Sequence, residues 1–422
     1  MKYGLNDKPS LFPMLLYGLQ WFVISVPSII ILGAITAEMN NSDMSAQILY
    51  MQKLFALIGF GLIVQVLWGH RLPLVIGPAS VLLVGIIAAT SQKADAVNTS
   101  ILLGGCFLFI LGASGLFNKI QRIFTPRIVS VILALIAFTL APVILHLIFG
   151  SKGPILFNFL LAFSLSLFMI YMNNRLQGVW RSTVVLLGLI LGMFIYFLFT
   201  NSFSLVWVTE VSSFTPSSLL NFHFKIDGGV ILSFLFCYVA LIVNELGSIQ
   251  SVGHQIGASA MDNRRRRGIC ATGLLNSFSG LLGVIGPVDY SLSPGVISAT
   301  GCASRYPLIP AGIGLIICAF FPSFIGMISS IPDVVVGTIL LYLMGSQLSA
   351  ALQMIAREKA VETFNSGLII GFPLMVALLI AFAPEAALAQ LPSLIRPILG
   401  NGFVMGTITV LFLEHIVFKE EK

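Results

Sequence analysis

The sequence predicts an all-α integral membrane protein with fourteen transmembrane spans, arranged as a 7+7 inverted repeat with two short broken spans. Three observations lead to this fold class. The first is composition: of the 422 residues, 57% are hydrophobic and only 9% are charged, and the mean hydropathy is +1.01. Such a chain has too little polar surface to cover a soluble globule. The other two are a series of apolar segments and a short repeat inside two of them.

A transmembrane helix needs about 20 mostly apolar residues. Segments of this kind are separated by short polar breaks along the whole chain. They occupy residues 13–35, 49–67, 74–90, 101–117, 128–149, 154–171, 182–200, 229–251, 268–284, 291–302, 306–329, 334–350, 362–382 and 395–418.

Lys and Arg indicate the orientation, because they accumulate on the cytoplasmic side of a membrane. With the N-terminus inside, 17 of the 22 Lys and Arg residues are cytoplasmic, and the five outside are Lys53, Lys93, Lys152, Lys225 and Arg396. We therefore expect a multi-pass protein of the plasma (inner) membrane with both termini cytoplasmic. No small-residue cleavage site follows the first apolar run, so we expect that span to be retained.

Two other features are expected to carry no chemistry. The run from Arg264 to Arg267 is interpreted as a topology signal, with a nucleic-acid or anionic-lipid patch as the alternative. The five cysteines lie in or beside expected spans without metal-ligand spacing, so we expect neither a disulfide nor a metal site.

The short repeat is Val75-Ile76-Gly77-Pro78, which recurs as Val284-Ile285-Gly286-Pro287. The copies occupy the third and tenth segments, which correspond in two sets of seven. Because seven is odd, the second set enters the membrane with the opposite orientation. Gly and Pro break helices, and unpaired backbone at membrane depth is tolerated where it lines a cavity or is buried in protein. Two broken half-helices meeting near the midplane favour a ligand site, and two structural kinks are the alternative.

Glu245 is a lone carboxylate that follows the apolar run from Val230 to Val243. A charge at this depth is expensive and usually faces a protein interior or a watery cavity where it has a function. Burial disfavours the charged form, so such a group can bind a proton on one side and release it on the other. Glu245 is therefore the first candidate for substrate binding and for ion coupling, and a structural acid is the alternative.

Several segments resemble the nucleobase-ascorbate transporter family, the uracil and xanthine permeases. The segment from Gly295 to Arg305 resembles the end of the family's tenth-span signature. Leu19-Gln20, Gly77 with its short segment, and Asn244-Glu245-Leu246-Gly247 agree with the first, third and eighth spans. The resemblance covers nearly the whole chain in the order and spacing of its spans.

The resemblance implies one membrane unit, residues 1–422, with a short extended strand before each broken span. It implies a core domain of residues 13–117 and 229–329 and a gate domain of residues 128–200 and 334–418, with elevator-like movement between them. It also implies substrate contacts on the core and uptake coupled to protons or sodium, without another cofactor. The positions carried over are Glu245, Ser80, Tyr290, Ser291, Leu292, Ser293 and Ser28.

The chain departs from the family signature where the tenth span begins. The Gln or Glu of the signature is Leu292 here, and the following Asn is Ser293. Leu makes none of the paired hydrogen bonds that a carboxylate or carboxamide makes with a purine or pyrimidine edge. Glu245 is consequently expected to be the only acid in the site, serving both recognition and coupling.

Three function classes remain open from the sequence. The leading one is a secondary transporter of nucleobases or a similar small heteroaromatic compound. Its expected partners are the small-molecule substrate, the lipid bilayer and a second copy in a homodimer, and no nucleic acid is expected to bind. The second is an anion transporter or channel of the related inverted-repeat fold, and the third, a membrane enzyme, is disfavoured because no second catalytic group accompanies Glu245. Asp289 is interpreted as a helix cap, with a place in the outer vestibule as the alternative, and His70 as a topology residue.

Overall fold

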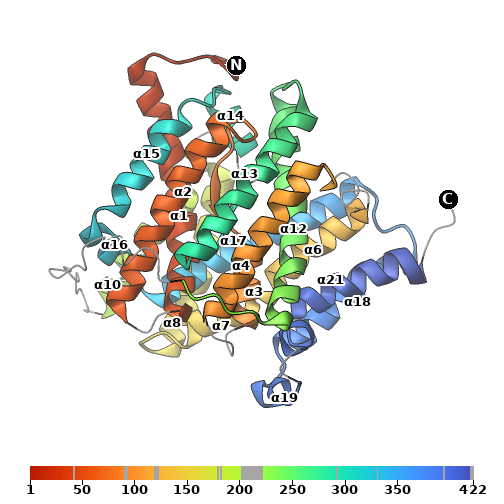
Figure 1. Ribbon diagram of the computed structural model, residues 1–422. Coiled ribbons are helices and arrows are strands. Elements are labelled where there is room, and N and C mark those ends of the chain that lie inside the picture. Colours follow the sequence, from red (N-terminus) through yellow and green to blue (C-terminus); the bar gives the residue numbers. More distant parts are fainter. Residues whose placement is uncertain are drawn as a thin grey trace.

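The computed structural model describes residues 1–40, 43–89, 94–117, 123–177, 180, 183–200, 222–290, 293–329, 331–392 and 395–418, and it is almost entirely helical (Figure 1). The first half contains α1 (Leu11–Asn40), α2 (Met44–Leu67), β1 (Ile76–Pro78), α3 (Ser80–Ala88), α4 (Ala94–Ser114), α6 (Pro126–Thr139), α7 (Ala141–Phe149), α8 (Ile155–Arg175) and α10 (Val184–Thr200). The second half contains α12 (Gly228–Gln255), α13 (Met261–Leu282), β2 (Pro287–Asp289), α14 (Ser293–Thr300), α15 (Leu308–Ala319), α16 (Pro322–Ser329), α17 (Asp333–Arg357), α18 (Phe364–Ala381), α19 (Glu385–Ala389), α20 (Arg396–Leu399), α21 (Gly402–Phe412) and a π-helical turn η1 (Leu413–Val417).

Each of the fourteen expected segments contains helix, and the expected all-α membrane fold is confirmed. In the described part of the chain, eight helical segments are long and apolar enough to cross a membrane, and three apolar helices are shorter. Three expected spans are divided, and the one at 395–418 consists of α20, α21 and η1. The span at 128–149 breaks between α6 and α7 beside Pro142, and the span at 306–329 breaks at Pro322, because proline cannot donate the helical hydrogen bond.

The two copies of the repeat meet as a two-stranded antiparallel sheet. Pro78 lies opposite Pro287, Gly77 opposite Val288, and the amide of Ala79 donates to the carbonyl of Gly286 at 2.9 Å. In the repeat, Gly77 corresponds to Gly286 and Ala79 to Val288. The pair Gly77–Val288 therefore has the pair Gly286–Ala79 as its counterpart, and the strand pairing has local twofold symmetry. This local twofold relation is what an inverted repeat requires.

The strands and the half-helices after them are short and deeply placed. All residues of β1 and β2 are buried, and α3 and α14 contain only 9 and 8 residues. At 1.5 Å per residue each half-helix extends about 12–14 Å, less than half of a hydrocarbon core. The residue before a proline is pushed towards extended conformations, which explains why the chain is extended at both Gly-Pro steps.

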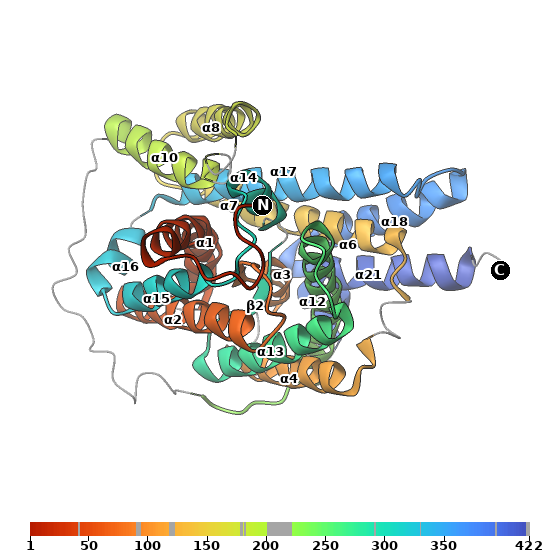
Figure 2. The same cartoon turned by 90° about the horizontal axis from the view of Figure 1, so that it is seen from above.

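The surrounding helices also exchange partners between the repeats. In the inverted repeat, α2 corresponds to α13 and α4 corresponds to α15. Helix α2 packs on α15, and α13 packs on α4, so each pair joins one helix from each repeat. Figure 2 shows α1–α4 and α12–α16 grouped around the strands, with α8, α10, α17, α18 and α21 outside this group. Across the boundary of this group, α12 contacts α20 and α21, and α3 contacts α6.

Small residues allow the paired helices to approach closely. A Cβ atom added at Gly59 of α2 or at Gly312 of α15 would meet the carbonyl oxygen of the other glycine. On the opposite side of the core, Gly105 of α4 and Gly273 and Gly280 of α13 face backbone atoms of the partner helix. Close packing through small residues is typical of helix association in membranes, where apolar burial between helices supplies little driving force.

Candidate functional site

Glu245 lies where α12 passes the crossing of the two strands, and its side chain is only 1% exposed. Its Oε1 accepts a hydrogen bond from the Thr272 hydroxyl of α13 at 2.5 Å, and its Oε2 accepts one from the amide of Asp289 in β2 at 3.0 Å. Both donors favour the ionised carboxylate, which otherwise would be costly to bury. The acid is therefore held in a fixed orientation by two elements of the second repeat.

The hydroxyl that binds Glu245 is itself held by α2. Gln65 Nε2 donates to Thr272 Oγ1 at 2.7 Å, which directs the hydroxyl proton of Thr272 towards Glu245. Gln65 Oε1 accepts from the amide of His70 at 3.3 Å. A chain of hydrogen bonds thus connects α2 of the first repeat with α13 and α12 of the second.

Asp289 and His70 form the other part of this buried network. Both side chains are 0% exposed, and His70 Nε2 lies 3.4 Å from Asp289 Oδ2. His70 Nδ1 accepts from the amide of Leu72 at 2.9 Å. The backbone carbonyl of Asp289 accepts from the Ser248 hydroxyl at 3.1 Å and from Asn244 Nδ2 at 3.4 Å, so α12 fixes β2 through several contacts.

Three expectations from the sequence are wrong at this point. Asp289 does not cap a described helix, because neither of its carboxylate oxygens has a hydrogen-bond donor among the described residues. His70 is a buried neighbour of Asp289 and not a surface topology residue. Glu245 is not the only buried acid at the crossing, since the Asp289 side chain is its hydrogen-bonding neighbour. One signal could have identified Asp289: it is the only charged residue between Gly268 and Ala303.

The remaining expected site residues surround the same crossing. The Tyr290 hydroxyl donates to the carbonyl of Pro78 at 2.7 Å and has the Ser28 side chain of α1 as a further hydrogen-bonding neighbour. Ser293 opens α14, and its hydroxyl accepts from the amide of Val75 at 3.0 Å. Ser80 is the first residue of α3, directly after β1. Ser291 and Leu292 lie outside the described residues.

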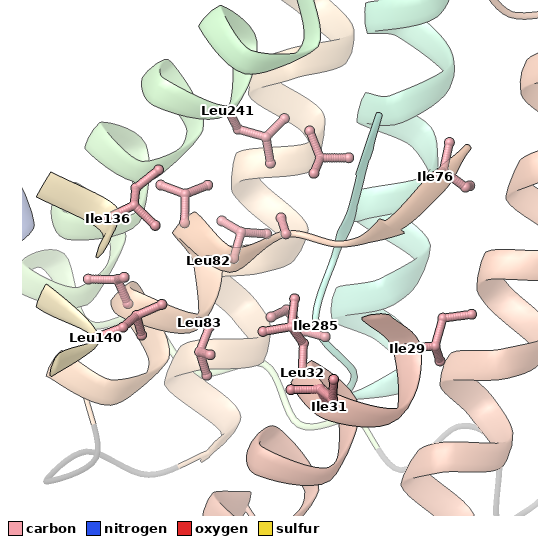
Figure 3. Close-up of a cluster of buried hydrophobic side chains, with 14 of the residues drawn as sticks. Ile29, Ile31, Leu32, Ile76, Leu82, Leu83, Ile136, Leu140, Leu241 and Ile285 are labelled. Atoms are coloured by element: carbon pink, nitrogen blue, oxygen red, sulfur yellow. The ribbon is translucent and has the colours of Figure 1, made fainter. Parts of the chain in front are cut away.

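An apolar cluster closes the crossing on the side of α6. Figure 3 shows Leu82 and Leu83 of α3 beside Ile136 of α6 and Leu140 at its end, with Leu241 of α12 above them. All five side chains are buried. The contact of α3 with α6 is made here by apolar side chains, and a contact of this kind can slide without breaking hydrogen bonds.

The described residues contain no group of three or more His, Cys, Asp or Glu side chains that could hold a metal ion. The five cysteines are free. The chemistry of the site therefore comes from carboxyl, hydroxyl, amide and imidazole groups, together with the N-terminal ends of α3 and α14. These are groups that bind and release a polar ligand or a proton.

An inverted-repeat membrane fold with two half-helices and a buried polar network at their crossing defines the class of membrane transporters. Comparison with solved structures agrees on the fold. The transmembrane domain of a cyanobacterial bicarbonate transporter matches with a TM-score of 0.65 and 15% identity, over 90% of this chain and 98% of that one. A murine anion transporter, solute carrier 26 family member A9, matches with a TM-score of 0.58 and 14% identity, over 96% and 69%.

Comparison of sequences identifies the family. The family model for xanthine and uracil permeases, described as "Permease family", matches residues 12–386. A Clostridium perfringens protein that is provisionally named a purine permease is 26% identical over 98% of this chain and 92% of its own length. The xanthine permease of Bacillus subtilis is 24% identical over 86% and 85%, and the uric acid permease PucJ of the same organism is 24% identical over 82% and 78%.

The chain belongs to this xanthine/uracil permease family. The resemblance to the nucleobase-ascorbate transporters is therefore confirmed, and the relatives are transporters and not enzymes.

Proposed function

We propose that the protein carries a purine, or a closely similar nucleobase, across the plasma membrane, and that a cation gradient drives this transport. The observation that carries the proposal is Glu245, a carboxylate held by Thr272 and the amide of Asp289 at the crossing of two broken spans. A carboxylate accepts hydrogen bonds from ring N–H groups, which oxidised purines present along their edges. The names of the relatives support a purine as the substrate.

The substrate position in this proposal is the space that opens between the strand crossing and α6 when the apolar contact there slides. Glu245 recognises the ring edge, Ser28, Ser80 and Tyr290 contribute hydroxyl groups, and Ser293 opens α14. A desolvated hydrogen bond to a charged group contributes about 1.5–3 kcal/mol. Removing the carboxylate charge should accordingly weaken binding about tenfold to a hundredfold.

Movement of the core, residues 13–117 and 229–329, against the gate, residues 128–200 and 334–418, would expose this position to each side in turn. The packing of α2 on α15 and of α4 on α13 and the apolar contact of α3 with α6 support this proposal, and the movement would have to break the hydrogen bond from Asn401 Nδ2 to the Ser233 hydroxyl of α12, 3.1 Å long. We further propose cytoplasmic termini, from the distribution of Lys and Arg, and a homodimer, from the family resemblance.

Uptake into proteoliposomes tests the proposal. Labelled xanthine, uric acid, hypoxanthine and uracil are offered singly and in competition, beside bicarbonate, sulfate and chloride, at an acidic and a mildly alkaline outside pH. We expect saturable uptake of at least one purine and none of the anions. Saturable anion transport that purines leave unaffected would favour the related anion transporters and contradict the proposal.

Three variants connect uptake to the site. Glu245→Gln is expected to raise the KM for the purine about tenfold or more. Thr272→Val removes the hydroxyl donor to Glu245 and should act in the same direction, whereas Thr272→Ser keeps the donor and serves as its matched control. A Glu245→Gln variant that transports with the original KM would remove Glu245 from the site.

A further inference from the structure

Asp289 is a buried carboxyl group that the recognition of a substrate by Glu245 leaves without a role. Neither of its oxygens accepts a well-formed hydrogen bond from an N–H or hydroxyl group of the described residues, and the side chain is fully buried. The nearby His70 Nε2 also has no hydrogen-bond partner there, although it points at Asp289 Oδ2 from 3.4 Å. Burying two polar groups without hydrogen bonds raises the free energy of the folded protein, so such a pair indicates that a ligand or a proton binds there during transport.

The hydrogen bonds around His70 fix its protonation state. Nδ1 accepts from the amide of Leu72, so the proton of the imidazole lies on Nε2, the nitrogen that faces Asp289. A second proton would have to break the bond to Leu72. His70 is therefore a neutral donor in this conformation, and a mobile proton has to reside on a carboxyl group.

The two carboxyl groups differ in what holds them. Glu245 accepts from the Thr272 hydroxyl and from the amide of Asp289, and both bonds favour its charged form. Asp289 receives no bond from an N–H or hydroxyl group of the described residues, and its carboxyl group lies against that of Glu245, where two negative charges together are unfavourable. One proton shared by this pair accordingly belongs on Asp289.

The other charges around the pair come from the cytoplasmic side. Glu245 of α12 faces both His70 and Asp289, and Arg264 of α13 faces His70. Arg264 Nη1 donates to the backbone carbonyls of His70 and Arg71, at 3.0 and 2.9 Å. A positive group held beside the loop that carries His70 favours release of a proton from Asp289 when that loop moves.

We propose that Asp289 carries the proton whose movement drives uptake, that His70 positions Asp289, and that Glu245 remains ionised to bind the substrate. The inference rests on the proposed function and deepens it by assigning the coupling ion and its residue. The proton enters from outside water, is enclosed on the carboxyl group of Asp289, and leaves to cytoplasmic water when the core moves. Sodium fits poorly, because the imidazole N–H in front of Asp289 would repel a metal ion.

Infrared difference spectroscopy on the purified full-length protein tests which carboxyl group binds the proton, and it needs no substrate. Between an acidic and an alkaline pH we expect one C=O stretching band of a buried carboxylic acid to appear and disappear. The band should be lost in Asp289→Asn and retained in Glu245→Gln and in the control Asp262→Asn, which alters an exposed acid. Any other pattern, including no titrating band in the original protein, overturns the proposal.

Transport provides the second readout. In Asp289→Asn the ratio of purine uptake at acidic to alkaline outside pH should fall to unity, with no dependence on sodium. His70→Leu should shift the midpoint of the pH profile, and His70→Gln, which keeps a donor at the place of Nε2, should restore it. An unchanged pH ratio in Asp289→Asn, or uptake that requires sodium, contradicts the proposal.

The two experiments separate this inference from the proposed function. If no purine is transported, the proposed function fails, while the infrared bands still decide where the proton binds. If Asp289→Asn does not fold, Asp289→Glu keeps a carboxyl group in a changed position. Its band should then move in frequency, and an unmoved band overturns the assignment.

Discussion

Replacing Gly77 by Ala should disrupt the strand crossing through one side chain, Tyr290. A Cβ atom at Gly77 would lie 2.6–2.7 Å from three atoms of the Tyr290 phenol, including its hydroxyl oxygen. Carbon atoms pack at about 3.5–4.0 Å, so the ring would have to move by about 1 Å. That displacement breaks the 2.7 Å hydrogen bond from the Tyr290 hydroxyl to the carbonyl of Pro78.

The magnitude follows from two terms. Overpacking a rigid site costs about 1–3 kcal/mol, and the lost hydrogen bond costs about 0.5–1.5 kcal/mol. Gly77→Ala should therefore destabilise the protein by about 2–4 kcal/mol. Tyr290→Phe removes only the hydrogen bond and should cost about 1 kcal/mol.

A double-mutant cycle identifies the cause. The stability of purified protein in detergent is measured for Gly77→Ala, Tyr290→Ala and the pair. With the ring gone the added Cβ fits, so the pair should be more stable than the sum of the single effects by about 2 kcal/mol. Gly286→Ala is the matched control, because its Cβ would meet the amide oxygen of Asn276 and not Tyr290. Additivity of Gly77→Ala with Tyr290→Ala to within about 0.5 kcal/mol would refute the reasoning.

Two further predictions concern packing away from the crossing. The ion pair between Glu414 and Arg127 joins η1 to α6 at 3.0 Å. Glu414→Gln weakens it and should lower the stability of the protein in detergent by about 1–3 kcal/mol. An unchanged unfolding midpoint would show that this partly exposed pair contributes nothing. Gly273→Ala places a Cβ against the backbone amide of Phe109 and should cost about 1–3 kcal/mol, whereas Gly345→Ala, which meets no atom within 4 Å, should be neutral or stabilising, and equal effects of the two would contradict the close packing of α4 on α13.

Signals that act over a few residues explain what could be predicted from the sequence. The apolar segments coincide with helices because burying an unpaired backbone in lipid is costly, so each segment must satisfy its own hydrogen bonds. The Gly-Pro steps at Gly77 and Gly286 predicted breaks, and the structure has an extended strand at the first and directly after the second. The burial of Glu245 was also predictable, because a carboxylate in an apolar helix is unfavourable in contact with lipid and therefore faces the protein interior or a water-filled cavity.

The partners of Glu245 could not be predicted in this way. Thr272 and Asp289 are 27 and 44 residues away along the chain, and His70 belongs to the other repeat. Asp289 alone in the sequence resembles a helix cap, and His70 beside Arg71 resembles a topology signal, since both interpretations use only neighbouring residues. The resemblance to a family pointed to the tenth span but placed the missing acid at Leu292, whereas this chain has one three residues earlier.

The sequence by itself determined that this protein is a helical membrane transporter with a duplicated, inverted architecture and an acid at membrane depth. Local hydropathy, proline chemistry and the distribution of positive charge suffice for these conclusions. Only the tertiary structure decided that Glu245, Thr272, Asp289 and His70 share one buried network. The antiparallel pairing of β1 with β2 brings the two repeats together there, and no pattern within either repeat specifies which side chains then meet.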